Sequence, residues 1–223
     1  MSAAPPAGPA AAAGPAGVTA VLFDFGGVIT ASPFGAFARY ERDHGLPDGF
    51  IRSVNATNHL DNAWARLERN ELGFDEFCDA FAVEALDAGG AVDARDLFGL
   101  LSGELRPDMV EAVRRCGRHF KTGLLTNNFV SPLAAARPSA LGEVLSLFDV
   151  VLESSVVGVR KPDEGFYVMA CEALEIAPAQ AVFLDDLGVN LKPARALGMT
   201  TIKVTDPALA LGELEGVLGI ALR

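Results

Sequence analysis

The chain has 223 residues, half of them apolar, and a formal net charge of -11 at pH 7. This length suits one catalytic domain with one inserted module. The apolar residues occur in short runs, and none reaches the roughly 18 residues that a membrane span needs. The acidic surface disfavours contact with the phosphates of nucleic acids and with anionic lipid headgroups. We therefore expect a soluble, cytoplasmic protein that binds neither nucleic acid nor membranes.

The first 17 residues, MSAAPPAGPAAAAGPAG, contain no Lys or Arg and are interrupted by prolines. They lack the basic start and the unbroken apolar stretch of a signal peptide. Their composition predicts a disordered tail, because it offers too little apolar surface to offset the cost of ordering the backbone.

The three cysteines, Cys78, Cys116 and Cys171, are widely spaced and form no CxxC pair. This pattern argues against a disulfide framework and against a zinc site. We expect three small buried apolar residues in a reducing compartment.

Short apolar runs rich in β-favouring residues recur along the rest of the chain. The first, VTAVLFDFGG from residue 18, ends at two glycines; the others span 120–128, 149–155, 181–188 and 200–206. Helical patterns at 107–119, 164–176 and 190–198 lie between or before them. Strands that alternate with helices predict an α/β fold with a doubly wound parallel sheet, a Rossmann-like core formed by residues 18–30 and 106–223.

Residues 31–105 show helical periodicity with no strand signal, which predicts an inserted α-helical cap. The insertion follows the first strand directly, so we expect it to stand over the ligand site and to exclude water. The cap residues that we consider for contact with a substrate are Phe34, Phe37, His59, Asn62, Trp64 and Arg66.

Polar residues follow the predicted strands at the edge where parallel sheets bind ligands. They are Asp24, Thr126, Asn127, Asp185 and Asp186. Asp24 precedes Gly26 and Gly27, so its carboxylate would project from the strand end while the turn brings backbone groups close to a ligand. This is a suitable position for a nucleophile.

Asp185 and Asp186 near a third carboxylate would repel one another unless a cation compensates them. Magnesium prefers few protein carboxylates, several waters and a substrate phosphate oxygen. We therefore predict a Mg²⁺ site made of Asp24, a carbonyl group of the turn that follows it, and one of the pair Asp185 and Asp186.

Two further groups could bind an anionic substrate. The hydroxyl group of Thr126 and the N–H groups that follow it, at Asn127, could hold a phosphoryl oxygen. Lys161, in the segment GVRKP, could act as a point charge that neutralises both the nucleophile and a phosphate group.

The motifs DFGGV, LLTNN, GVRKP and FLDD, in this order, resemble those of the haloacid dehalogenase-like hydrolases. The resemblance implies that Asp24 attacks phosphorus and forms an aspartyl-phosphate, which water then hydrolyses with the help of Mg²⁺. It also implies that Thr126 and Lys161 bind the phosphoryl group of a small phosphorylated substrate. Asp24, the Gly26 carbonyl and Asp186 would hold the ion.

The chain also resembles the phosphatase-like domain at the amino end of mammalian soluble epoxide hydrolase and its bacterial relatives. The segments WARLERNELGFDEF, FLDDLGVNLKPARALGMTTIKV and LGIAL carry this resemblance, which leaves only residues 1 to about 17 uncovered. It implies that Asn190 orients Asp186 or Lys161. Cap helices of this kind often pair, so we also expect a homodimer.

One residue departs from the family pattern. Phosphatases of the family usually carry a second Asp two residues after the nucleophile, where this chain has Gly26. That Asp protonates the leaving oxygen and later activates water. Three functions therefore stay open: a slow or selective phosphomonoesterase, a metal-independent 2-haloacid dehalogenase, and a catalytically silent phosphate-binding module.

Overall fold

The computed structural model describes residues 17–101, 103–129 and 139–223 of the chain. The prediction of a disordered tail concerns residues that, apart from Gly17, lie outside this part. Five strands form one sheet in the order β3-β2-β1-β4-β5, and every pairing between neighbours is parallel. The strands are β1 (Ala20–Phe23), β2 (Lys121–Thr126), β3 (Val150–Glu153), β4 (Ala181–Asp185) and β5 (Thr200–Lys203). The predicted parallel sheet is confirmed.

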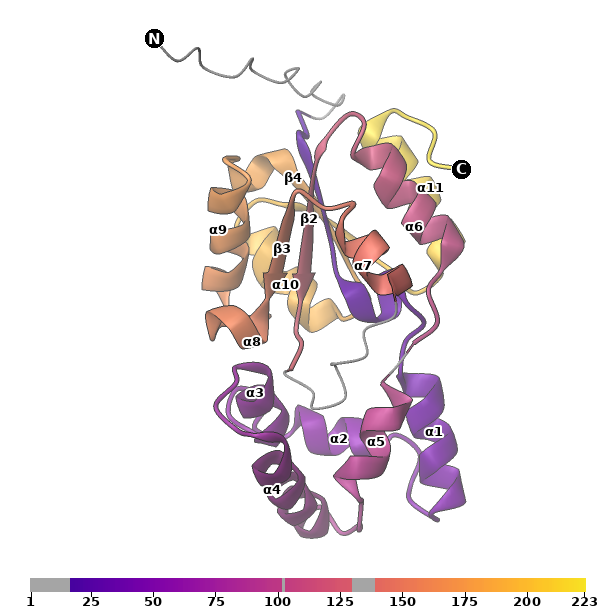
Figure 1. Ribbon diagram of the computed structural model, residues 1–223, viewed down its shortest axis with the longest axis vertical. Helices are drawn as coiled ribbons and strands as arrows, with labels where there is room; N and C mark the ends of the chain where they lie inside the picture. Colours follow the sequence, from indigo (N-terminus) through magenta and orange to yellow (C-terminus); the bar gives the residue numbers. More distant parts are fainter. Residues whose placement is uncertain (1–16, 102, 130–138) are drawn as a thin grey trace.

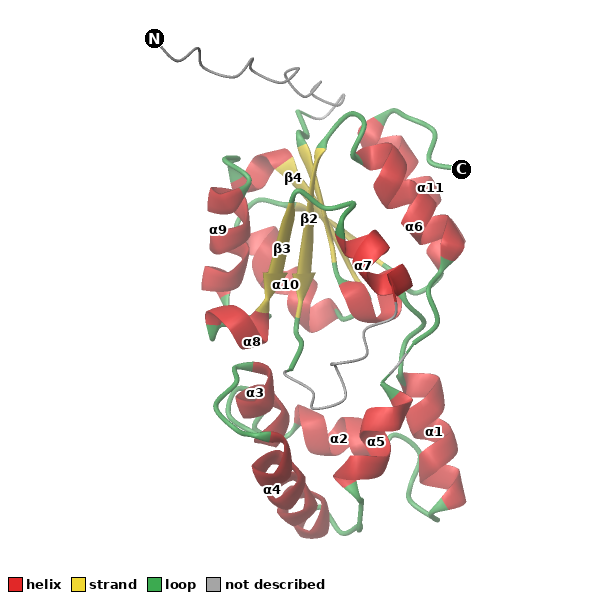
Figure 2. Cartoon of the chain, viewed as in Figure 1, coloured by secondary structure: helices red, strands yellow, loops and turns green. Residues whose placement is uncertain are grey.

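Helices cover both faces of this sheet (Figures 1 and 2). Those of the core are α6 (Pro107–Cys116), α7 (Ser139–Leu145), α8 (Ser154–Val157), α9 (Glu164–Ala173), α10 (Gly188–Ala196) and α11 (Pro207–Leu218). Successive side chains of a strand point to opposite faces, and every residue of β1 is buried because both faces are covered.

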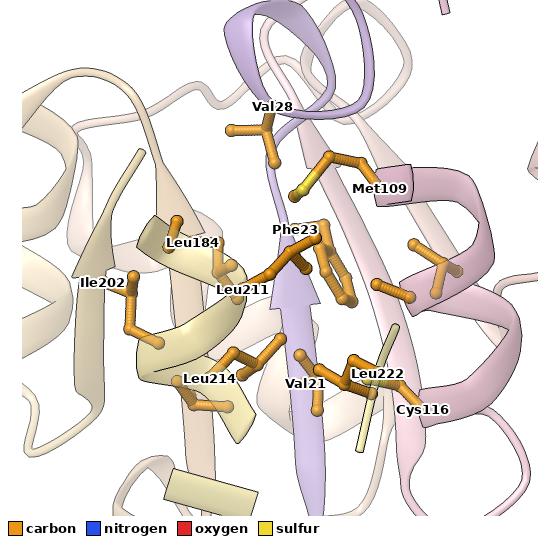
Figure 3. Packing of buried hydrophobic residues seen from close by; sticks show 14 of the residues in the cluster. Val21, Phe23, Val28, Met109, Cys116, Leu184, Ile202, Leu211, Leu214 and Leu222 are labelled. Atoms are coloured by element: carbon orange, nitrogen blue, oxygen red, sulfur yellow. The ribbon is translucent and has the colours of Figure 1, made fainter. Parts of the chain in front are cut away.

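The two faces of β1 contribute to different apolar clusters. Val21 and Phe23 pack with residues of α6 and α11, as Figure 3 shows. Ala20 and Leu22 pack with residues of α9 and α10 on the other face. This packing fixes the strand end, and therefore the residue that follows it, within a rigid core.

A second, separate group of helices lies beyond the carboxyl ends of the strands (Figure 1). We call it the helical module; it consists of α1 (Phe34–Asp43), α2 (Phe50–Ala56), α3 (Ala63–Glu68), α4 (Phe74–Asp87) and α5 (Ala94–Leu100). It has its own apolar cluster, in which Trp64 stacks edge-on against Phe77 with ring centroids 4.9 Å apart. These helices fall in the segment predicted as the cap.

The module joins the core through a stem in which the outgoing and returning segments run side by side. The N–H of Ala31 donates to the carbonyl of Glu104 at 2.8 Å, and the N–H of Arg106 donates to the carbonyl of Ile29 at 2.9 Å. Gly103 faces this contact so closely that a side chain there would overlap the Ala31 carbonyl. The entry and the exit of the module are therefore one structural unit.

Two elements differ from the sequence-based expectation. The apolar run at 149–155 ends as a strand at Glu153, and its last two serines begin α8. No element was expected after residue 206, where the structure has α11. Gly212 and Gly216 interrupt the pattern of this helix.

The three cysteines are free and buried, as expected. No helix of the described part is long and apolar enough to cross a membrane.

Candidate active site

Asp24 follows β1 directly and is 7% exposed. Its N–H donates to the carbonyl of Leu184 in β4 at 2.9 Å, which continues the ladder by one residue. Its side chain accepts a hydrogen bond from the N–H of Phe25 at 2.7 Å. The sheet and the turn together hold the carboxylate at the edge where ligands bind to parallel sheets.

Asp185 is the last residue of β4 and Asp186 follows it, so the two bring further carboxylates to Asp24. One carboxylate oxygen from each of the three residues lies within 4.8 Å of the others. Asp185 is completely buried and Asp186 is half-buried. Three carboxylates this close in a buried site need positive charge nearby.

Lys161 supplies one positive charge to this group. Its Nζ lies 2.7 Å from Oδ1 of Asp24 and 2.8 Å from Oδ2 of Asp185, and the residue is 1% exposed. Burial alone would lower the pKa of the ammonium group, but the charges of Asp185 and Asp24 outweigh this effect and raise it. Lys161 therefore stays charged. Three ionised carboxylates beside one ammonium would leave two negative charges uncompensated.

The excess of negative charge and the burial of the site both raise the pKa values of Asp24 and Asp186. Burial raises the pKa of Asp24 to about 8; Asp185 and Asp186 act in the same direction and Lys161 opposes them. Burial and the charge of Asp185 raise the pKa of Asp186 to about 6. A second source of positive charge at this position would lower the pKa of Asp24 and of Asp186 and favour their ionised forms.

The oxygens of Asp185 are engaged by the protein itself. They accept hydrogen bonds from the N–H of Leu187 at 2.8 Å and from Nδ2 of Asn190 at 3.0 and 3.1 Å, besides the contact with Lys161. Asp186 has a longer contact, 3.5 Å from Oγ of Ser32. Asp186 and Asp24 therefore have more free acceptor capacity for a ligand than Asp185 has.

Asn190 does not contact the groups that were expected. The sequence favoured Asp186 or Lys161 as its partner, but its amide nitrogen binds Asp185 and reaches Lys161 only through that residue. The first turn of α10 begins three residues after β4 ends, so it folds back onto the last strand residue. Asp186 points away toward the turn that follows β1, as the proximity of its carboxylate to Gly27 indicates.

The two glycines of that turn have different surroundings. Gly27 adopts φ +79°, and a side chain there would overlap the carboxylate of Asp186. Gly26 has φ -70° and no heavy atom within 4 Å of the position that a Cβ would take. Gly27 is thus required by geometry, whereas the space beside Gly26 would accept a larger residue.

Asn127 and Thr126 follow each other at the end of β2 but have different environments. The side chain of Asn127 binds the backbone of Lys161 twice: Oδ1 accepts from its N–H at 2.9 Å, and Nδ2 donates to its carbonyl at 3.0 Å. Thr126, the last residue of β2, is half-buried. Asn127 therefore holds the loop that carries Lys161.

A cavity of about 450 Å³ lies between the strand ends and the helical module. The core contributes Asp24, Gly26, Asn127, Lys161, Asp186 and Asn190 to its wall. The module contributes Phe34, Phe37, His59, Asn62, Trp64 and Glu68. The described part of the wall does not include Thr126, Gly27 or Arg66, and Arg66 instead lies 3.9 Å from Glu71.

Glu68 and Arg160 were not singled out from the sequence, although both line the cavity. Nε of Arg160 lies 2.6 Å from Oε2 of Glu68, across 92 positions of the chain. Burial raises the pKa of Glu68, an effect that Arg160 opposes. The one sequence feature that could have indicated Arg160 is its position directly before Lys161.

The family model described as haloacid dehalogenase-like hydrolase matches residues 18–198. Among curated proteins, the chain is 33% identical to bifunctional epoxide hydrolase 2 of Sus scrofa, over 91% of the chain and 39% of that protein. It is 30% identical to a phosphatase of Mycobacterium tuberculosis, over 82% of the chain and 85% of that protein. The chain spans less than half the length of the mammalian relatives that it matches.

Solved structures share the fold. A HAD family enzyme of Bacteroides thetaiotaomicron, in complex with magnesium and inorganic phosphate, matches with a TM-score of 0.56 at 17% identity. The match covers 84% of this chain and 94% of that one. The family match covers most of the sequence. The chain belongs to the haloacid dehalogenase-like hydrolases.

Proposed function

We propose that the protein is a magnesium-dependent phosphomonoesterase that acts on a small organic phosphate, with Asp24 as the nucleophile. The observation that carries this proposal is the contact of Asp24 with Lys161 inside a group of three carboxylates beside the cavity between the core and the helical module. A phosphatase needs such an arrangement, because the nucleophile and the substrate are both anionic.

The residues present fit a Mg²⁺ ion. The donor set consists of oxygens alone, and two negative charges are left uncompensated by Lys161. Asp24, Asp186 and the carbonyl of Gly26 would hold the ion, while Asp185 adds negative charge and keeps its internal hydrogen bonds. When bound, the ion would neutralise charge and polarise the phosphoryl group. The enzyme of Bacteroides thetaiotaomicron, which shares the fold and was crystallised with magnesium and inorganic phosphate, supports the choice of magnesium.

The chain's own residues would supply the nucleophile and the stabilisation of charge on the transferring group. An oxygen of Asp24 attacks phosphorus, the bond from phosphorus to the leaving oxygen breaks, and an aspartyl-phosphate forms. Water then attacks the same phosphorus atom, which releases inorganic phosphate and restores Asp24. Lys161, anchored by Asn127, stabilises charge on the transferring group. Thr126 belongs to the proposal through the family resemblance alone.

The leaving alcohol needs a proton, and Gly26 cannot supply it. We therefore propose that the enzyme prefers substrates with good leaving groups, or substrates that provide the proton themselves. The relatives support a phosphatase: besides the mycobacterial protein, they include a validoxylamine A 7'-phosphate phosphatase of Streptomyces hygroscopicus, 28% identical over 88% of the chain.

A 2-haloacid dehalogenase is the second candidate, and Gly26 is the observation that favours it. Halide leaves without a proton, so a glycine there would cost nothing. The acidic group argues against this function, because a reaction without metal would leave two negative charges uncompensated. A silent phosphate-binding module is the third possibility.

Hydrolysis of p-nitrophenyl phosphate and of 2-chloropropionate, each with and without Mg²⁺, separates these functions. We expect turnover of the phosphate ester only with the metal, and none with Asp24→Asn. Chloride release that does not depend on metal would instead identify a dehalogenase. Inactivity toward both substrates, together with phosphate binding, would identify a silent module.

A further inference from the structure

One ion pair joins the helical module to the core. Among ion pairs of described residues, the others lie within the module or within the core, whereas Glu68 at the end of α3 pairs with Arg160 in the loop before α9. Its N···O distance is 2.6 Å. Arg160 also donates from Nη1 to the carbonyl of His59, in the loop before α3, at 3.0 Å. A single core arginine thus binds two points of the module.

The exposure of this pair distinguishes it from ordinary surface pairs. The side chains of Arg160 and Glu68 are 17% and 16% exposed, compared with 52% and 82% for Arg95 and Asp75 within the module. Exposed pairs contribute little, whereas breaking a largely buried pair leaves a charge without its partner. The Glu68–Arg160 contact is therefore sensitive to changes in the docking of the module.

Arg160 is also the neighbour of Lys161, and this connects docking to the reaction site. The backbone of Lys161 is held by Asn127, and its ammonium contacts Asp24. Glu68, Arg160 and Lys161 all line the same cavity. A shift of Arg160 would move the backbone that carries Lys161.

We propose that Glu68 and Arg160 are positioning residues, which dock the helical module onto the Lys161 loop and so couple closure of the cavity to placement of the lysine. The coupling to catalysis rests on the proposed function. The docking itself does not, because it concerns the free protein.

Trp64 reports on docking independently of activity. It is the only tryptophan of the chain, it lines the cavity, and it is 8% exposed. Quenching of its fluorescence by acrylamide measures the access of a small molecule to the cavity. Loss of docking would raise quenching without any substrate present.

The experiment compares Glu68→Arg, Arg160→Glu and the double variant with the wild-type chain. We expect each single reversal to raise the Stern–Volmer constant about twofold, because a largely buried ring becomes accessible. We expect kcat/KM for p-nitrophenyl phosphate to fall about tenfold to a hundredfold, mainly through kcat, because the lysine is misplaced. The double variant restores the ion pair in reverse and should recover most of both values.

Asp75→Arg is the matched control, because it reverses the acidic member of an exposed pair inside the module. It should leave both values within about twofold of wild type. Glu68→Gln and Arg160→Gln give the same comparison if a charge reversal prevents folding, which thermal unfolding would reveal.

Unchanged quenching in both single variants would overturn the docking role. Increased quenching with unchanged kcat/KM would overturn the coupling to Lys161. If the wild-type protein hydrolyses no phosphate ester, the proposed function fails, while the quenching arm still decides whether Glu68 and Arg160 dock the module.

Discussion

Gly27 and Asp186 approach each other so closely that a methyl group on Gly27 would overlap the carboxylate, with the Asp186 Cγ only 2.5 Å from the new carbon. The backbone of Gly27 is also left-handed, at φ +79°. We therefore expect Gly27→Ala to destabilise the fold by about 1–3 kcal/mol and to displace Asp186. Chemical denaturation measures the first effect, and the Mg²⁺ dependence of hydrolysis measures the second.

Gly26→Ala is the control for this variant. Its backbone, with φ -70° and ψ 127°, is extended and accessible to any residue, and the space around it is open. It should change stability by no more than about 0.5 kcal/mol. Equal losses in the two alanine variants would mean that the close approach of Gly27 to Asp186 is unimportant.

Gly26→Asp tests the missing proton donor. The open space beside Gly26 can hold the new side chain at the cavity wall. We expect kcat/KM for alkyl phosphates, which have poor leaving groups, to rise about a hundredfold, with a smaller gain for p-nitrophenyl phosphate. Gly26→Asn has the same size without the acid and should show no such gain. A uniform gain for both substrates would contradict this explanation.

Removal of magnesium should destabilise the folded state. The ion would bind the three carboxylates only when the fold brings them together, and not in the unfolded chain. At a free Mg²⁺ concentration 100 times Kd, the stabilisation is about 2.7 kcal/mol. For a chain of this size it corresponds to a rise in Tm of roughly 5–10 °C. Differential scanning fluorimetry measures this shift.

Asp186→Asn should abolish the shift, since it removes a carboxylate with free acceptor capacity. Asp206→Asn is the control, because Asp206 caps α11 away from the site and accepts from the N–H of Leu209. It should retain the wild-type response. A shift that survives in Asp186→Asn would exclude Asp186 as a ligand.

Asn190→Ala tests the support of Asp185. It removes two hydrogen bonds to a completely buried carboxylate, and Asn190 itself is 4% exposed. We expect a loss of about 1.5–3 kcal/mol in the free energy of unfolding. Val189→Ala, at an exposed neighbouring position, should cost no more than about 0.5 kcal/mol. Urea denaturation of both variants checks the difference, and similar losses would argue against the role of the amide.

The parts of the fold that could be predicted are those determined by local patterns. The runs at 181–188 and 120–128 are apolar, short and followed by polar residues, and they form β4 and β2. Because carboxyl ends of parallel strands share one edge, the meeting of Asp24 with Asp185 and Asp186 follows from the same patterns. Local spacing was therefore sufficient for the acidic group.

The remaining contacts depend on packing between distant segments. Glu68 and Arg160 are joined only after the helical module docks, and no local spacing marks them. The partner of Asn190 depends on how the first turn of α10 meets β4, which decides between two adjacent aspartates. Helix α11 was not predicted because its glycines weaken the helical pattern in the sequence. Packing against the sheet stabilises the helix in the structure.

The hydrogen-bonded stem formed by Ala31 and Glu104 has an evolutionary consequence. Since both ends of the helical insertion leave the core at one place, a longer, shorter or unrelated insertion could be accommodated without disturbing the sheet. The helical module is thus an exchangeable cassette carried on a constant scaffold.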